Sequence, residues 1–248
     1  MTKEQSWGAG MDLSLFAIGP TGWGDELIAG FGLTLRLGLS GVIFGTALGL
    51  VAALTELSAS RWLGRAMEAW NVILRSVPEL LVIFLVYYGA SFGLQALLRP
   101  FGIDRFIDVS AFWAAVIALS VIHAAYASEV FKGAFIAVPA EQIEAARAFG
   151  MSRGLAFARI KLPIALRLAF AGLVNMVLVT LKSTPLVSAI GLQDLIRAAG
   201  EAGQNTKYYF QFFMASLVVY LIIAAGALAL QLVSERRLYR HLRRERAA

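Results

Sequence analysis

Long apolar runs alternate along this chain with short segments that carry most of its charged residues. A helix needs about 20 predominantly apolar residues to cross the hydrocarbon core of a bilayer. Five runs come close to this length or exceed it, at about 27–54, 72–98, 111–130, 164–181 and 209–233. The pattern therefore predicts an all-α, polytopic membrane protein with about five transmembrane helices.

The composition supports this fold class and excludes several kinds of site. Hydrophobic residues make up 59% of the 248 residues, charged residues make up 15%, and the mean hydropathy is +0.72. No cysteine is present, which excludes a disulfide framework and a thiolate metal site. The first twenty residues contain no sustained apolar core, so we expect no cleavable signal. The first span is expected to act as an uncleaved targeting signal.

The basic residues gather at the ends of the apolar runs, which predicts the orientation of the chain in the membrane. Segments 55–70, 131–163 and 234–248 hold thirteen Lys and Arg residues, whereas the segments on the opposite side hold five. Because cytoplasmic loops carry the excess of Lys and Arg, the N-terminus should lie outside and the C-terminus in the cytoplasm. No nucleic-acid partner is expected, since the basic residues are not interleaved with aromatic ones.

This orientation divides the chain into three parts. Residues 1–26 form an N-terminal periplasmic segment, and residues 27–233 form a transmembrane domain whose hairpin at 131–163 is cytoplasmic. Residues 234–248 form a basic cytoplasmic tail, which is expected to touch anionic membrane lipid.

Three glycines in the first span predict a close contact between helices. Gly41, Gly45 and Gly49 recur every four residues, so they share one face of the helix. A face without side chains lets another backbone approach closely. The alternative is that these glycines face lipid, since Gly is frequent in membrane-spanning helices.

The polar segment between the third and fourth spans predicts a short helix at the membrane surface. Pro139 suits a first helical turn, and Glu141 and Glu144 lie near the positive end of the helix dipole. Gly150 can adopt the left-handed conformation that ends a helix. The expected helix is about ten residues long. It carries Ala145 and Ala146, whose small side chains a partner could approach closely.

Catalytic chemistry has few candidates in this sequence, and we expect no enzymatic activity. The phosphate-binding pattern G-x-x-x-x-G-K-[ST] is missing, because Lys182-Ser183 follows Leu181 instead of a glycine-rich turn. Only His123 and His241 are available for a catalytic triad, and no metal-ligand spacing is present. Energy for transport would come from a partner or from an ion gradient.

Ionisable residues inside apolar spans are costly and therefore mark candidate sites. A cationic substrate needs a carboxylate once water is removed, and Glu79 and Glu129 are the best-placed acids. Ser183 and Thr184 could donate hydrogen bonds between spans two, three and four. Arg75 could bind the carboxylate of a substrate in a bidentate way.

A purely structural role is equally open for both acids. Glu79 lies four residues from Arg75, and Glu129 lies three residues from Lys132, so each acid could pair along its own helix. His123 could titrate near neutral pH, but a buried and hydrogen-bonded histidine is the expected state.

The hairpin also carries a motif that resembles the cytoplasmic signature of permease subunits of ABC importers. The motif reads EAA, three residues, G, nine residues, I, one residue, L and P. The matching residues are Glu144, Ala145, Ala146, Gly150, Ile160, Leu162 and Pro163. This resemblance implies a type I ABC importer permease fold, whose EAA coupling helix docks on a cytoplasmic ABC ATPase dimer. ATP and magnesium would bind to that partner, and no cofactor is expected in this chain.

The resemblance implies two further protein partners. Five spans form a small wall, so a second permease subunit, identical or homologous, is expected to complete the path. A periplasmic amino-acid-binding protein would deliver the cargo. Asp194, which follows Gly191 on the outer side, could meet that binding protein or could be an ordinary solvated acid.

Three runs resemble a narrower group, the polar amino-acid permeases for histidine, arginine, ornithine and opines. They read RSVPELLVIFLVYYG at 75–89, YASEVFKGAF at 126–135 and LKSTPLVSAIGLQDL at 181–195. The implied cargo is a cationic or polar amino acid, such as arginine, histidine, ornithine or lysine, or an opine. It would be imported across the bacterial inner membrane by alternating access. The chain departs from this group at Pro185, where alanine is more frequent.

Two other functions remain compatible with the residues alone. An ion-coupled secondary amino-acid transporter would use Glu79, Glu129 or His123 as its proton site. A membrane scaffold would transport nothing.

Overall fold

The computed structural model describes residues 13–20, 22–58, 60–102 and 109–238. Residues 1–12 of the predicted periplasmic segment and residues 239–248 of the predicted tail lie outside the described residues. Five helices are long and apolar enough to cross a membrane, as the hydrophobic pattern predicts. They contain α1 (Gly24–Glu56), α3 (Glu79–Leu98), α4 (Ala111–Ile136), α7 (Leu162–Ser183) and α9 (Tyr209–Leu238).

Shorter elements connect these helices. In chain order they are η1 (Leu13–Phe16), α2 (Arg61–Ser76), η2 (Arg99–Phe101), α5 (Ala140–Ala148), α6 (Arg153–Ala156), η3 (Phe157–Lys161), η4 (Thr184–Ile190) and α8 (Leu195–Thr206).

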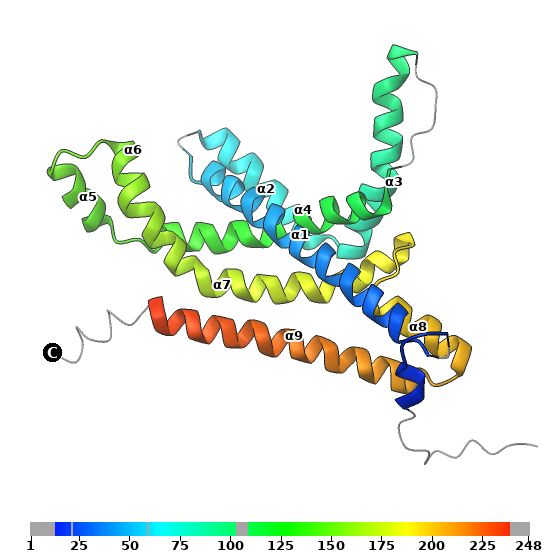
Figure 1. The fold of residues 1–248 in the computed structure, drawn as a ribbon. Helices are drawn as coiled ribbons and strands as arrows, with labels where there is room; N and C mark the ends of the chain where they lie inside the picture. The colour runs from blue at the N-terminus through cyan, green and yellow to red at the C-terminus, as the bar shows by residue number, and fades with distance from the viewer. Residues whose placement is uncertain (1–12, 21, 59, 103–108, 239–248) are drawn as a thin grey trace, which may run out of the picture.

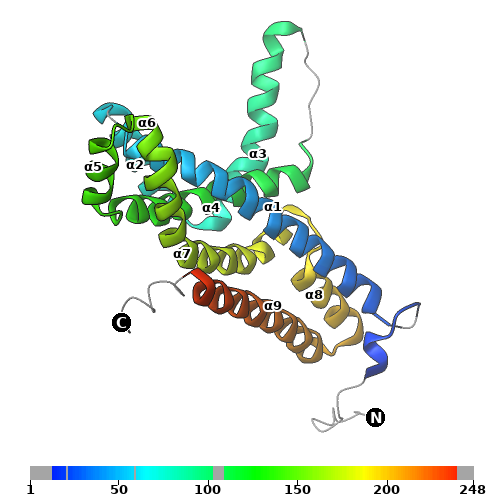
Figure 2. The same ribbon diagram turned by 60° about the vertical axis from the view of Figure 1, so that its left-hand side comes forward.

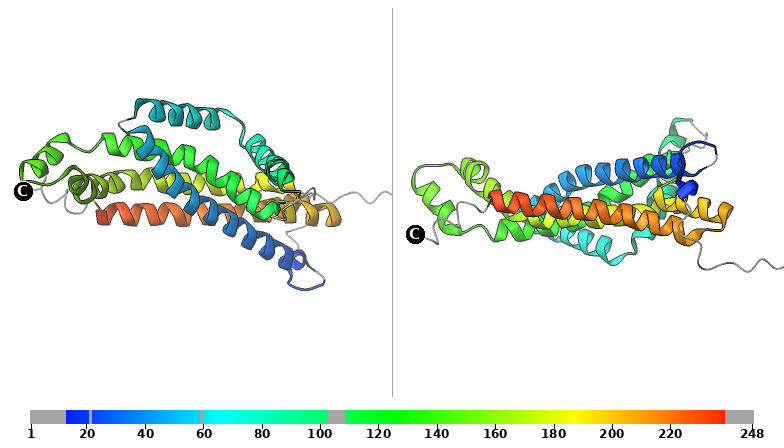
Figure 3. Two further views of the ribbon diagram at one scale, coloured as in Figure 1. Left: turned by 90° about the horizontal axis from the view of Figure 1, so that it is seen from above. Right: turned by 60° about the horizontal axis from the view of Figure 1, so that its bottom comes forward.

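Helix α4 lies at the centre of the bundle and packs against α1, α7, α3 and α2. The views agree that α5 and α6 lie at one end of the bundle and that α8 lies at the other (Figures 1 and 3). We call these the hairpin end and the α8 end. Helix α9 begins beside α8 and runs back toward the hairpin end. Helix α1 also starts near α8 and ends toward the hairpin, so the spans pass between the two ends.

Helix α3 differs from the other spans, because most of it projects away from the bundle (Figures 1 and 2). We call this projecting part of α3 the arm. Its first turns pack against α4 and η4, where Val82 and Ile83 are buried. Farther along, Tyr88 and Phe92 are exposed. The arm therefore offers an apolar surface to lipid or to another protein chain.

The glycine face of α1 packs directly on α4, as predicted. A Cβ atom added to Gly45 would lie 2.7 Å from the Cβ of His123, and one added to Gly49 would lie 2.8 Å from the Cβ of Ala127. Real Cβ contacts are almost never this short. The backbones of α1 and α4 can approach this closely only because the glycines have no side chain.

The second span begins later than the sequence predicts, and its predicted start at Val72 is wrong. Pro78 has no N–H group, and it disfavours the helical conformation of the residue before it. Val77 is accordingly extended, with ψ 137°, so α2 ends at Ser76 and a new helix starts at Glu79. Helix α2 turns a partly polar side inward, where Asn71 is buried. Hydropathy alone therefore did not identify it as a separate element.

The hairpin forms much as the sequence predicts. Helix α5 has nine residues and starts directly after Pro139. Gly150 adopts the predicted left-handed conformation, with φ +86°. The backbone N–H of Met151 then donates to the carbonyl of Ala146 over 3.1 Å, which satisfies one of the free carbonyls at the helix end.

The return from the hairpin into α7 contains a wider turn than the sequence suggests. Residues 157–161 form a π-helix, η3, between α6 and α7. The ring of Phe157 stacks on that of Phe135 in α4, with 5.9 Å between centroids. The helical segment that contains the fourth span therefore extends from Arg153 to Ile190, well beyond the predicted 164–181.

Asp194 has neither of the roles that the sequence suggests, because it is fully buried. It is the N-cap of α8, and its carboxylate accepts hydrogen bonds from the backbone N–H groups of Ile196 and Arg197. Burial raises the pKa of this carboxyl, and the two N–H donors oppose the rise. Next to it, Leu195 N–H donates to the buried hydroxyl of Thr34 over 3.2 Å, which fastens α8 to α1.

Candidate functional site

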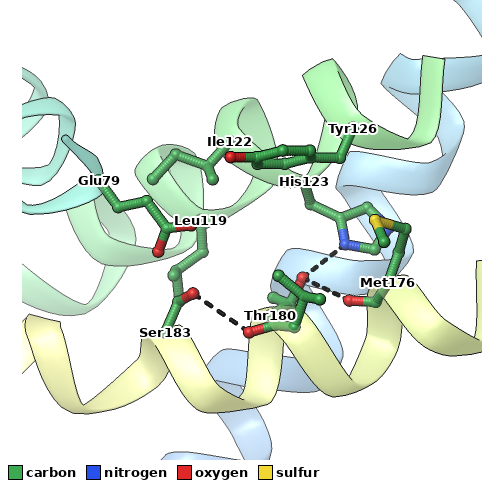
Figure 4. A pocket seen from close by; sticks show the side chains of 9 residues that line it. Glu79, Leu119, Ile122, His123, Tyr126, Met176, Thr180 and Ser183 are labelled. Atoms are coloured by element: carbon green, nitrogen blue, oxygen red, sulfur yellow. Dashed lines mark hydrogen bonds between the residues drawn. The ribbon is translucent and has the colours of Figure 1, made fainter. Parts of the chain in front are cut away.

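A recess opens between the start of α3, the middle of α4 and the last turns of α7 (Figure 4). Its empty space is about 240 Å³, including the part that is open to the outside. Five of the nine side chains around it carry a polar group, and four are apolar. The lining residues are Glu79, Leu119, Ile122, His123, Tyr126, Met176, Val179, Thr180 and Ser183.

Glu79 is the one acid in this lining, and its carboxylate points toward α7 (Figure 4). It is half-buried, and within the described residues it forms no ion pair and accepts no hydrogen bond. The alternative that Glu79 pairs with Arg75 along one helix is therefore wrong. The break at Pro78 explains this, because Arg75 and Glu79 belong to two different helices. A cationic group in the recess would find a carboxylate that no side chain neutralises.

His123 is buried and hydrogen-bonded, as predicted, and lies at the meeting point of three spans. It is 2% exposed. Its Nε2 lies 3.0 Å from the hydroxyl of Thr46 in α1, and its Nδ1 lies 2.6 Å from the hydroxyl of Thr180 in α7. Both ring nitrogens have partners, so His123 joins α1, α4 and α7 and leaves no free nitrogen toward the recess.

Arg75 and Glu129 lie outside the lining of the recess and pair with each other. The Nη2 of Arg75 lies 3.0 Å from the Oε1 of Glu129, which joins α2 to α4. The alternative pair between Glu129 and Lys132 does not form either. Lys132 instead lies 2.8 Å from the Oε2 of Glu56 and 3.3 Å from the Oε1 of Glu68. We therefore remove Arg75 and Glu129 from the candidate substrate site.

The two predicted hydroxyl donors have different positions. Ser183 lines the recess, although its hydroxyl donates to the carbonyl of Val179 over 3.1 Å. Thr184 does not reach it. Its hydroxyl is fully buried, donates to the carbonyl of Leu181, and lies 3.5 Å from the hydroxyl of Tyr220 in α9. The prediction is wrong for Thr184 because η4 begins there and turns the side chain toward α9.

The EAA helix α5 has an inner and an outer face. Ala146 is buried on the inner face. The prediction that both alanines form a surface for a partner is therefore wrong for Ala146. Glu144 and Ala145 are exposed, and so is Gly150. Phe149, at the end of the helix, is 89% exposed although no membrane span contains it. A short helix that exposes a carboxylate and ends at an exposed phenylalanine is suited to binding another protein.

The second half of the motif holds the hairpin in place. Leu162 is partly buried among Phe131, Phe135 and Ala165, and Ile160 is half-buried in η3. Pro163 directly follows the π-helix inside a continuous helical segment, and its missing N–H removes one backbone hydrogen bond next to the wide turn. These three residues lie in η3 and α7 and support the hairpin. They are not part of the exposed face of α5 that carries Glu144.

The sequence did not single out Phe149, Tyr126 or Glu56. Phe149 directly precedes the helix-ending glycine, so its position was visible, but its exposure was not. Tyr126 lies one turn from His123 and lines the same recess. Glu56 ends the first apolar run and looks like an ordinary boundary residue in the sequence, yet its side chain is 2% exposed.

Among the described residues, no three His, Asp or Glu side chains gather as a metal site would require.

Comparisons with known proteins give one family. Residues 45–239 match the family model described as "binding-protein-dependent transport system inner membrane component". The chain is 38% identical over 216 residues to the histidine/lysine/arginine/ornithine transport system permease protein HisQ of Salmonella typhimurium, covering 87% of this chain and 94% of that protein. It is 37% identical to the nopaline transport system permease protein NocQ of Agrobacterium fabrum, covering 87% and 92%.

Two solved structures share the arrangement of helices. An amino acid ABC transporter crystallised with histidines matches with a TM-score of 0.74 and 29% identity, covering 87% of this chain and 95% of that chain. The methionine transporter MetNI in an inward-facing conformation matches with a TM-score of 0.64 at 18% identity, over 87% and 95% of the two chains, which supports the fold alone.

Proposed function

Since the chain belongs to the family of binding-protein-dependent transport system inner membrane components, as an amino-acid ABC importer permease subunit, we propose that it imports a basic amino acid or an opine. It is a multi-pass inner membrane protein. The hairpin end would face the cytoplasm and the α8 end the periplasm. ATP and magnesium would bind to a separate ATPase dimer, which supplies the energy for alternating access.

The observation that carries this proposal is the outer face of α5. This helix lies beyond the spans at the hairpin end, and it exposes a carboxylate at Glu144 and an aromatic ring at Phe149. A water-exposed phenylalanine is unfavourable until a partner covers it. Through this face, closure of the two ATPase subunits would push on the hairpin and thereby on α4 and α7.

The carboxylate in the recess supports a basic amino acid as the cargo. Glu79 offers a carboxylate without a partner, and the hydroxyls of Tyr126 and Ser183 lie near it. The ammonium or guanidinium group of a basic amino acid would pair with Glu79, whereas a neutral side chain would leave the carboxylate uncompensated. The relatives named for histidine, lysine, arginine, ornithine and nopaline transport support the same class of cargo.

A recess of this size holds at most a side chain, so the site needs a second wall. We propose that a second permease subunit supplies this wall, and that the apolar arm α3 packs against it. A binding protein would deliver the amino acid at the α8 end. The tail would touch anionic lipid.

Reconstitution into liposomes tests the function. We expect uptake of arginine, histidine or ornithine only when this permease, its ATPase, the binding protein and ATP are all present. Uptake that continues without the ATPase and stops when the ion gradient collapses would favour a secondary transporter. Absence of uptake under every condition would favour a scaffold.

Replacing Glu79 by glutamine is expected to weaken the response to basic amino acids selectively. A hydrogen bond to a charged group contributes about 1.5–3 kcal/mol, so the half-maximal arginine concentration for stimulated ATP hydrolysis should rise at least about tenfold. Stimulation by glutamine, measured in the same complex, should change little. An equal loss for arginine and glutamine would contradict a role of Glu79 in recognising charge.

A further inference from the structure

Polar and charged side chains gather where α1, α2 and α4 meet near the hairpin end, apart from the recess and from the outer face of α5. We call them the α2–α4 polar cluster. Its inner part joins Glu56 of α1 to Asn71 of α2 and to Ser128 and Lys132 of α4. Its outer part is the ion pair between Arg75 of α2 and Glu129 of α4.

The inner part is built around a carboxylate that is shielded from solvent, whereas the side chain of Lys132 is 23% exposed. The side chain of Glu56 is 2% exposed, and its Oε2 lies 2.8 Å from Lys132 Nζ. Its Oε1 accepts hydrogen bonds from Asn71 and from the hydroxyl of Ser128, the latter over 3.1 Å. Lys132 also reaches Glu68 of α2 over 3.3 Å. A buried carboxylate with three partners on two other helices holds those helices in one arrangement.

Helix α4 connects this cluster to the hairpin. Lys132 lies in the last turns of α4, between Phe131 and Phe135, which belong to the core that holds the hairpin. Ile143 of α5 and Phe157 of η3 pack against the same core. A displacement of the hairpin therefore moves the end of α4 that carries Glu129 and Lys132.

Helix α2 connects the cluster to the recess. Arg75 lies in its last turn, and only Val77 and Pro78 separate α2 from Glu79, the first residue of α3. This link is short and stiff, because Pro78 fixes its own backbone angle and restricts Val77. When α2 moves, Glu79 is therefore expected to move with it.

We infer that the α2–α4 polar cluster is the link through which movement of the hairpin reaches Glu79, and that Arg75, Glu129 and Lys132 are positioning residues for transport. This inference rests on the proposed function, since it assumes that an ATPase moves the hairpin. The residues touch no substrate. They make α2 and the carboxylate of Glu79 follow α4, so that hydrolysis at the hairpin end alters the recess.

The test compares Arg75→Glu, Glu129→Arg and the exchange variant that carries both changes, in the complete reconstituted importer. Each single variant places like charges together, whereas the exchange variant restores the pair in reverse. We expect the single variants to keep basal ATP hydrolysis but to transport about tenfold fewer amino acids per ATP hydrolysed, within the usual range of coupling between sites. The exchange variant should recover most of that ratio.

A merely structural role makes a different prediction. The melting temperature, basal hydrolysis and uptake would then fall together while the ratio stays constant. That result, or a loss that the exchange variant does not repair, would overturn the inference. If the single variants do not assemble, Arg75→Gln and Glu129→Gln remove the pair without adding repulsion and are judged by the same ratio. Failure of the unaltered importer to use ATP would instead count against the proposed function.

Discussion

Replacing Glu144 by lysine is expected to abolish ATP-driven uptake while the protein still inserts into the membrane. Glu144 is exposed on the outer face of α5 and forms no ion pair within the described residues, so the change should not disturb the fold. At a protein interface, reversing a charge that pairs with the partner costs several kcal/mol, which corresponds to a loss of affinity of about a hundredfold or more. The measurement is co-purification of the ATPase together with uptake in liposomes.

Glu26→Lys is the matched control for this experiment. It makes the same chemical change on an exposed glutamate, but in the first turn of α1 and therefore at the α8 end. We expect ATPase binding, the readout that separates the two variants, to remain normal in Glu26→Lys. Uptake that survives Glu144→Lys, or an equal loss of ATPase binding in both variants, would contradict the assignment of α5 as the coupling helix.

Replacing Gly45 by leucine is expected to prevent α1 from packing on α4. A Cβ atom there would lie 2.7 Å from the Cβ of His123 and 2.8 Å from the carbonyl oxygen of Ser120, and the backbone oxygen cannot move aside. Overpacking costs about 1–3 kcal/mol in ordinary cores. A higher cost is expected here, because the helices must separate along their whole contact. The measurement is the melting temperature in detergent and the yield of folded protein.

Gly32→Leu provides the comparison within the same helix. No atom lies within 4 Å of a Cβ built at Gly32, so a larger side chain has room. Both substitutions add the same apolar volume and raise helix propensity equally. A comparable loss of stability in the two variants would show that the glycine face is not the reason for the effect.

The membrane-spanning helices could be predicted because each is recognised by its hydropathy averaged over a long stretch of sequence. A run of 18 or more apolar residues needs no knowledge of its neighbours, and the helix stop at Gly150 needs only the local sequence. Helix α2 was missed for the opposite reason. Its buried side is partly polar, since Asn71 faces other side chains and not lipid, so the usual relation between burial and hydropathy does not hold there.

The candidate site could be predicted only in part, because pairing between helices is set by packing. Arg75 and Glu79 are close in sequence, yet the helix break at Pro78 separates them. Glu129 then finds Arg75, which lies 54 positions away in the chain. Glu79 and Ser183 do line the recess, and their contact with a substrate stays a prediction. Thr184 follows Ser183 directly, but one helical step is about 100° and turns it to another face.

The π-helix η3 changes what the spacing of the motif means. Nine residues separate Gly150 from Ile160, and the wide turn at 157–161 lies between the short helix and the final LP. Removing one residue there would convert the wide turn into an ordinary α-helical one. A π-helical turn holds about one residue more than an α-helical turn for the same rotation, so the hairpin would keep its direction around the axis of α7. The wide turn therefore accommodates one more residue between Gly150 and the final LP without changing the direction in which Glu144 points.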